Sequence, residues 1–126
     1  MSQSLPKPTD AELNILQVLW KSGEATVKQV QENLGGDTGY TTVLKFLQIM
    51  TEKGLVRRDE TLRAHVYRAT LSEDETQQQL VSGLLKRAFG GSTSKLVLQA
   101  LASKKASTRE LAEIRLMIEK LGKEKS

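Results

Sequence analysis

The residues with the most distinctive chemistry lie in one stretch, residues 40–54, which reads YTTVLKFLQIMTEKG. Apolar side chains recur there at i, i+3, i+4 and i+7, a spacing that predicts a helix with one buried face. The members of this predicted buried face are Val43, Phe46, Leu47 and Met50. The predicted solvent-facing stripe consists of Thr41, Leu44, Lys45 and Gln48. Its hydroxyl, amide, ammonium and methyl groups can contact a patterned polar surface.

The edges of DNA bases are a surface of that kind. A glutamine amide can pair bidentately with adenine, a lysine can donate to guanine, and methyl groups can meet the methyl of thymine. Thr41 and Thr42 lie at the predicted helix start, where hydroxyl and backbone N–H groups also suit a phosphate. A plainer interpretation stays open as well, in which Thr41 is a helix N-cap, the leucine is an ordinary exposed residue, and Lys45 and Gln48 are good helix formers.

The elements around this stretch predict a winged helix-turn-helix. Thr9 and Glu12 form a capping box before a helix that Gly23 ends, and Thr26 can cap a second, shorter helix. Trp20, at the end of the first helix, is expected in the core. After the third helix, residues 55–69 read LVRRDETLRAHVYRA, which predicts two short strands around a polar tip, with His65 as a packed or half-exposed strand residue. In such proteins the recognition helix enters the major groove.

The charge distribution agrees with an anionic partner. The whole chain of 126 residues carries a net charge of +4, but residues 41–68 hold six basic and three acidic side chains. We therefore expect Arg57, Arg58 and Arg63 of the predicted hairpin to contact DNA phosphates, although a solvated surface would have the same composition.

The remaining residues, 71–126, predict helices that cannot form a core of their own. Ser72 with Glu75 and Ser107 with Glu110 are further capping boxes, and Gly90-Gly91 separates two helices. So short a segment buries too little surface to be stable alone, yet its apolar stripes are wide, which favours a homodimer. The expected dimerisation residues are Leu80, Leu84, Leu85, Leu96, Val97, Leu101, Ile114, Met117, Ile118 and Leu121. The predicted organisation is a disordered arm (1–8), a winged-helix DNA-binding domain (9–70) and a helical dimerisation domain (71–126), a mainly α fold with a small β-hairpin.

Several classes of function are excluded or disfavoured. The chain has no cysteine and one histidine, so disulfides and thiolate metal sites are impossible, and no nucleophile–base pair supports an enzyme. We expect no metal and no cofactor. The sequence shows no secretory signal and no run of some 18 apolar residues that would insert into a membrane, and the absence of cysteine fits a cytoplasmic protein.

Several segments together resemble the penicillinase-repressor (BlaI/MecI) family of bacterial transcriptional regulators. They are TDAELNILQVLW, YTTVLKFLQIMTEKGLVRR, RAHVYRA and FGGS, and the resemblance runs from about Thr9 to Leu121. It implies a dimer that binds a palindromic DNA operator and blocks transcription, with Thr41, Thr42, Leu44, Lys45 and Gln48 facing the groove. The alternative is a winged helix that binds a protein through the third helix, without sequence-specific DNA binding.

The resemblance has two departures. Family members that respond to β-lactams are cut by a membrane sensor-protease at an Asn-Phe bond, where this chain has Gln99-Ala100. We therefore expect release from the operator by proteolysis, but we assign no cleaved peptide bond. Copper-responsive relatives use a cysteine cluster, which this chain lacks.

Overall fold

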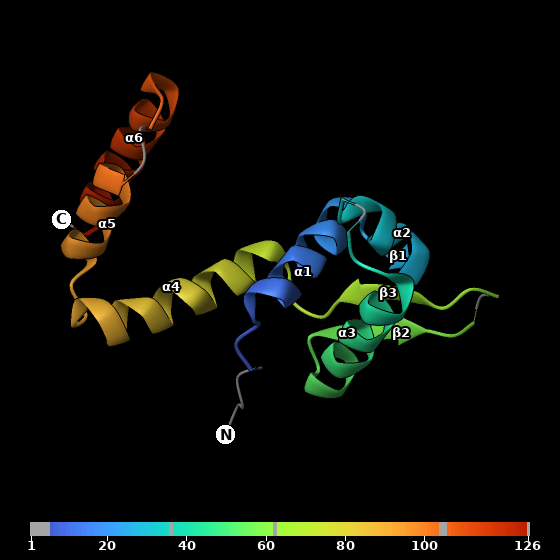
Figure 1. The fold of residues 1–126 in the computed structure, drawn as a ribbon. Coiled ribbons are helices and arrows are strands. Elements are labelled where there is room, and N and C mark those ends of the chain that lie inside the picture. The colour runs from blue at the N-terminus through green and yellow to red at the C-terminus, as the bar shows by residue number, and fades with distance from the viewer. Residues whose placement is uncertain (1–5, 36, 62, 104–105, 126) are drawn as a thin grey trace. The chain divides into compact units, whose positions relative to one another are not determined.

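The computed structural model describes residues 6–35, 37–61, 63–103 and 106–125, and it divides into two compact units, Met1–Ser82 and Gly83–Ser126 (Figure 1). Helix α4 begins in the first unit and ends in the second. The predicted disordered arm at residues 1–8 falls mostly on residues 1–5, which lie outside the described residues. Of its described part, Pro6 and Lys7 are exposed and Pro8 is buried.

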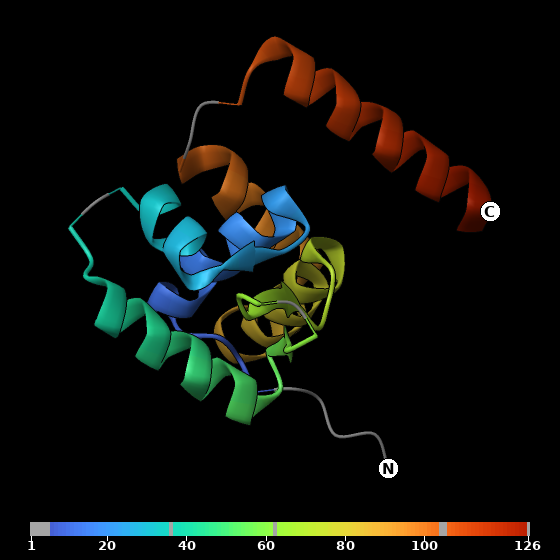
Figure 2. The same ribbon diagram turned by 90° about the vertical axis from the view of Figure 1, so that its right-hand side faces the viewer.

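The first unit has the predicted order of three helices followed by a hairpin. Its elements are α1 (Asp10–Ser22), β1 (Ala25–Thr26), α2 (Val27–Asn33), α3 (Tyr40–Lys53), β2 (Val56–Asp59), β3 (Val66–Ala69) and the first part of α4 (Glu73–Phe89). The loop between β2 and β3 extends beyond the helices in Figure 1 and points toward the viewer in Figure 2. This is a winged helix-turn-helix, and the predicted fold class is confirmed.

The sheet has one strand more than the sequence predicts. The two residues of β1 pair antiparallel with β3, so the strand order is β1-β3-β2. Such a short strand is defined by its pairing with another strand and has no periodicity of its own. Its effect is to join the entry of α2 to the base of the hairpin.

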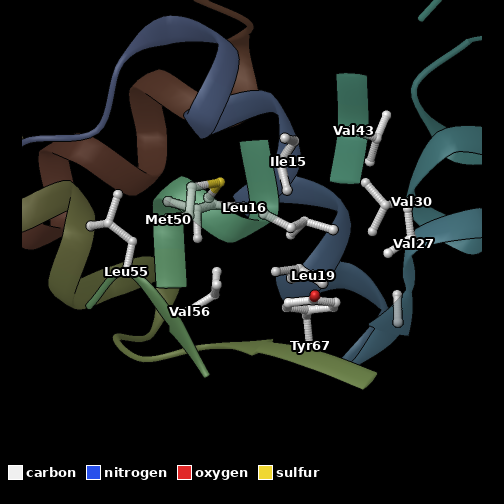
Figure 3. Close-up of a cluster of buried hydrophobic side chains, with 12 residues drawn as sticks. Ile15, Leu16, Leu19, Val27, Val30, Val43, Met50, Leu55, Val56 and Tyr67 are labelled. Atoms are coloured by element: carbon white, nitrogen blue, oxygen red, sulfur yellow. The ribbon is translucent and has the colours of Figure 1, made fainter. Parts of the chain in front are cut away.

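The apolar core lies between the sheet and the three helices. Figure 3 shows Val56 and Tyr67 pointing from the strands toward the helical side chains. The buried hydrophobic residues are Ile15, Leu16, Leu19, Ala25, Val27, Val30, Val43, Leu47, Met50, Leu55, Val56, Val66 and Tyr67. Trp20 packs against this cluster, as expected, and its indole N–H also donates to the carbonyl of Leu71 at 2.9 Å.

The helix ends follow from local sequence. The four predicted caps are present, since the side chains of Thr9, Thr26, Ser72 and Ser107 each accept from a backbone N–H three residues on. Gly54 ends α3 at φ 83° and ψ 10°, a left-handed conformation that costs an L side chain energy and glycine none.

A buried ion pair connects the start of α1 to the end of α3. The side chain of Glu12 is 3% exposed; one carboxylate oxygen accepts from the backbone N–H of Thr9 and the other from the ammonium of Lys53, each at 2.9 Å. Burial alone would raise the pKa of the Glu12 carboxyl, but its bonds to Lys53 and Thr9 outweigh that effect and hold the pKa below its ordinary value.

The second unit contains the end of α4 followed by α5 (Thr93–Ser103) and α6 (Thr108–Lys125). Helix α6 continues to Lys125. None of the described residues from Gly83 to Lys125 is buried. None of the described helices of the chain is long and apolar enough to cross a membrane.

We predict that Glu12→Gln lowers the free energy of unfolding at pH 7 by about 1–3 kcal/mol, because it removes the charge that compensates Lys53. Since the pKa of Glu12 is lower in the folded state, its contribution is present above the unfolded pKa and disappears as the pH falls through the carboxyl range, from about 5 downward. The difference in the free energy of unfolding between the wild type and Glu12→Gln should therefore become smaller at acidic pH.

Urea unfolding at pH 7 and pH 4 measures both effects. Glu24→Gln is the matched control, because Glu24 pairs with Arg68 at 2.6 Å in an exposed position and should contribute less than about 1 kcal/mol. Equal destabilisation by the two substitutions would contradict a special role for Glu12.

Candidate nucleic-acid interface

Helix α3 begins one residue before Thr41. Its N-cap is Gly39, which provides no side-chain hydrogen bond, and Tyr40 is the first helical residue. The interpretation of Thr41 as an N-cap is therefore wrong, because its backbone already belongs to the helix. The Thr41 hydroxyl is exposed in the first turn and is not needed for capping.

One side of α3 is fixed in the core and the other faces solvent. Val43, Leu47 and Met50 are each 0% exposed, which holds the helix rigidly against its unit. Thr41, Thr42, Lys45 and Gln48 are exposed, as predicted. The stripe at i, i+4 and i+7 from Thr41 continues to Glu52, which is also exposed. That carboxylate opposes close approach of phosphate near the end of α3, so the first part of the helix is the better groove-facing segment.

Leu44 and Phe46 differ from their expected positions. Leu44 was placed on the solvent-facing stripe, yet it is half-buried and packs against the core. Phe46 was placed with the buried face and is likewise only half-buried. In a helix, the burial of positions at the edge of a stripe depends on the neighbouring elements as well as on the helical period.

Strand register separates the two arginines at the start of the wing. Arg58 is opposite Tyr67 and Arg57 is opposite Arg68. Directly opposed residues share a face of an antiparallel pair. Tyr67 is 1% exposed and points toward the helices, so Arg58 lies on the side of the sheet that carries α3. Arg57 lies on the other side.

The wing tip is shaped by a short hydrogen-bonded turn. One oxygen of Asp59 accepts from the backbone N–H of Thr61 at 2.9 Å and from its hydroxyl at 2.7 Å. These bonds to Thr61 lower the pKa of the Asp59 carboxyl, which therefore stays ionised. Beyond this turn Arg63 is exposed, as predicted, while Arg58 forms an ion pair with Glu60. His65 is exposed and precedes β3, so it is not the strand residue that the alternation predicted.

A hollow of about 550 Å³ lies between the start of α3 and the base of the wing. Its walls include Lys28, Tyr40, Leu44, Arg63, His65 and Tyr67. None of the described residues that line it is acidic. Sequence reasoning missed Lys28 and Tyr40, since three elements far apart in the chain form this surface and no periodicity connects them. Glu52 could have been found, because helical spacing from Gln48 places it on the stripe.

Nothing in the described part of the chain indicates a metal centre. Within residues 6–35, 37–61, 63–103 and 106–125, no three His, Asp or Glu side chains are grouped so that they could hold an ion. The chemistry of the first unit is that of a surface with exposed amide, hydroxyl and cationic groups on a rigid helix. Such a surface is suited to the recognition of another molecule.

A family model described as penicillinase repressor matches residues 8–120, nearly the whole chain. The chain belongs to the penicillinase repressor family. It is a DNA-binding transcriptional repressor with a winged-helix domain, and it is not an enzyme. The resemblance stated from the sequence is thereby confirmed.

Two relatives and one solved structure illustrate the membership. The penicillinase repressor of Bacillus licheniformis is 24% identical over 119 residues, 93% of each chain. The transcriptional regulator BlaI of Mycobacterium tuberculosis is 39% identical over 83 residues, 64% of this chain and 57% of its own. The solution structure of the monomeric Bacillus licheniformis BlaI in complex with the blaP half-operator has a TM-score of 0.50 at 24% identity, over 57% of this chain and 90% of that one. This last likeness concerns the fold.

We predict that the two neighbouring arginines of β2, Arg57 and Arg58, differ in their contribution to DNA binding by this repressor. Arg58→Ala should weaken binding to DNA and reduce the salt dependence, the slope of log K against log salt, by up to about 0.9, the loss of one phosphate contact. Arg57→Ala should leave both nearly unchanged, because its side chain lies on the face away from α3. Fluorescence anisotropy at four salt concentrations measures the slopes. The register argument is wrong if Arg57→Ala has the larger effect.

Proposed function

We propose that this repressor acts in the cytoplasm as a homodimer on a palindromic operator, with one α3 in the major groove of each half-site. The observation that carries the proposal is the exposed set of Thr41, Lys45 and Gln48 on a helix whose opposite side is held in the core by the buried Val43, Leu47 and Met50. A helix held in this way presents base-reading groups with little loss of backbone freedom on binding. The solved BlaI complex, whose fold is similar, contains a half-operator.

The half-burial of Leu44 bears on the alternative function. A freely exposed leucine on α3 would favour a protein-binding winged helix, but Leu44 is half-buried against the core of the chain itself. The polar groups of the stripe remain, and they suit base edges better than an apolar protein surface. DNA recognition is therefore the reading that the stripe supports best.

The second unit supports the proposed dimer. Seven of its apolar side chains are more than 40% exposed in the single chain: Leu84, Leu98, Leu111, Leu116, Met117, Ile118 and Leu121. On α6, helical spacing places Leu111, Ile114, Ile118 and Leu121 on one side, with Met117 at its edge. A large apolar face without cover marks an association site, and a second copy is the occupant that a two-fold operator requires. The other predicted dimerisation residues are half-buried: Leu80, Leu85, Leu96, Val97, Leu101 and Ile114.

Release of the operator would follow from disruption of this unit. Two linked DNA-binding domains gain affinity because the second binds at a high effective concentration, and separating them removes that gain. Gln99 and Ala100 are exposed in α5, so a membrane sensor-protease or another partner that unfolds or cuts this helix is the proposed means of induction.

Gln48 is the residue we expect to read one base pair. Gln48→Ala should relax the preference at a single operator position by about 1–3 kcal/mol. The matched control is Gln17→Ala, an exposed glutamine of α1 that lies outside the stripe. Selection from random duplexes, followed by affinity measurements on single-base variants, gives the preference at each position. A uniform loss for all sequences would mean that Gln48 does not read a base.

Ile118 and Leu116 test the dimer within one helix. They are 60% and 65% exposed but lie on opposite sides of α6. Ile118→Glu should give monomers in analytical ultracentrifugation and reduce affinity for the full operator by about 100-fold or more, with half-site affinity unchanged. Leu116→Glu should leave the dimer intact. Dimers with Ile118→Glu would exclude this face as the interface.

A further inference from the structure

The hollow between α3 and the wing has the composition of a phosphate site. Lys28 and Arg63 supply two positive charges, and the Tyr40 hydroxyl and the His65 imidazole supply hydrogen-bonding groups. None of the described lining residues carries a carboxylate, although the chain has 15 acidic residues. The floor is apolar, with Leu44 half-buried and Tyr67 1% exposed.

The hollow adjoins the proposed base-reading stripe. Tyr40 and Leu44 are one helical turn apart on α3, and they stand beside Thr41 and Gln48 on the same helix. Lys28 is the second residue of α2, the helix that precedes the recognition helix. In helix-turn-helix proteins the helix before the recognition helix, which is α2 here, crosses the DNA backbone. A strand that borders the groove entered by α3 would therefore pass the mouth of the hollow.

We propose that the hollow seats one backbone phosphate of the operator strand that borders the major groove. Lys28 and Arg63 neutralise the phosphate, Tyr40 and His65 donate hydrogen bonds to its oxygens, and Leu44 contacts the adjacent sugar. The inference rests on the proposed function and assigns Lys28, Tyr40 and His65 a role in it. Because phosphate contacts fix position and do not read sequence, this seat sets the register in which Lys45 and Gln48 meet the bases.

The first experiment measures salt dependence with the full chain and an operator selected by that chain from random duplexes. Lys28→Ala should reduce the slope of log K against log salt by about 0.9 and lower affinity about tenfold, with base preferences unchanged. Tyr40→Phe should lower affinity without changing the slope, because it removes a hydrogen bond and no charge. The matched control is Lys21→Ala, an exposed lysine of the same unit that lines a different hollow, beside Asn33.

The second experiment locates the phosphate. Each backbone phosphate of the operator is replaced in turn by an uncharged methylphosphonate. One position in each half-site should weaken wild-type binding and have little additional effect on Lys28→Ala, because both changes remove the same contact. Identical methylphosphonate profiles for the two proteins would overturn the proposal.

The outcomes separate this inference from the proposed function. If the wild-type chain selects no operator, the proposed function fails. If it binds an operator but Lys28→Ala keeps the wild-type slope, the hollow is not a phosphate seat, although DNA recognition stands. If Lys28→Ala abolishes repression in cells but leaves operator affinity in vitro unchanged, the hollow serves another partner and the proposal is again wrong. Thermal melting of each variant checks that the fold is retained.

Discussion

The carboxylate of Glu12 is the point at which the geometry of the first unit is fixed. It accepts a hydrogen bond from the backbone N–H of Thr9, the N-cap of α1, and pairs with the ammonium of Lys53 in the last turn of α3. A buried charge with two partners is costly to disturb, since removing either partner leaves the other group uncompensated in a poorly solvated place. The end of α3 is therefore tied to the start of α1, while Val43, Leu47 and Met50 hold its length against the core. The exposed residues of α3 therefore lie on a helix backbone that is held in a fixed position.

The geometry of the strands and of helix α3 then determines which side chains face the core and which face solvent. On the hairpin, the alternation of side chains sends Arg58 and Arg57 to opposite faces, even though they are neighbours with the same charge. On α3, the helical period separates Lys45 and Gln48 from the core residues beside them. The hollow forms where these two elements meet the start of α2. If the hollow seats a phosphate as proposed, recognition of DNA by this repressor depends on three short segments that the core brings together from residues 26 to 67.

Much of this arrangement is written locally in the sequence. Capping boxes such as Thr9 with Glu12 need only a spacing of three, and Gly54 marks a helix end that requires a left-handed residue, so these features were predictable. The exposed positions of Lys45 and Gln48 follow from period alone. Other features depend on contacts between distant segments. Strand β1 exists only because β3 lies beside it, Lys53 pairs with a residue 41 positions away, and Leu44 is half-covered by neighbouring elements. The walls of the hollow likewise depend on contacts between segments that are distant in the sequence.

The lack of any buried side chain among the described residues from Gly83 to Lys125 has a consequence for how the protein behaves on dilution. The first unit has an interior, so its folding equilibrium is independent of protein concentration. A segment without an interior is stabilised by what it binds, and its order rises with the amount of that partner. With a second copy as the partner, the DNA-binding part would remain folded at low abundance while the helical part would lose its structure. The abundance of the chain in the cell would then decide whether two recognition helices act together.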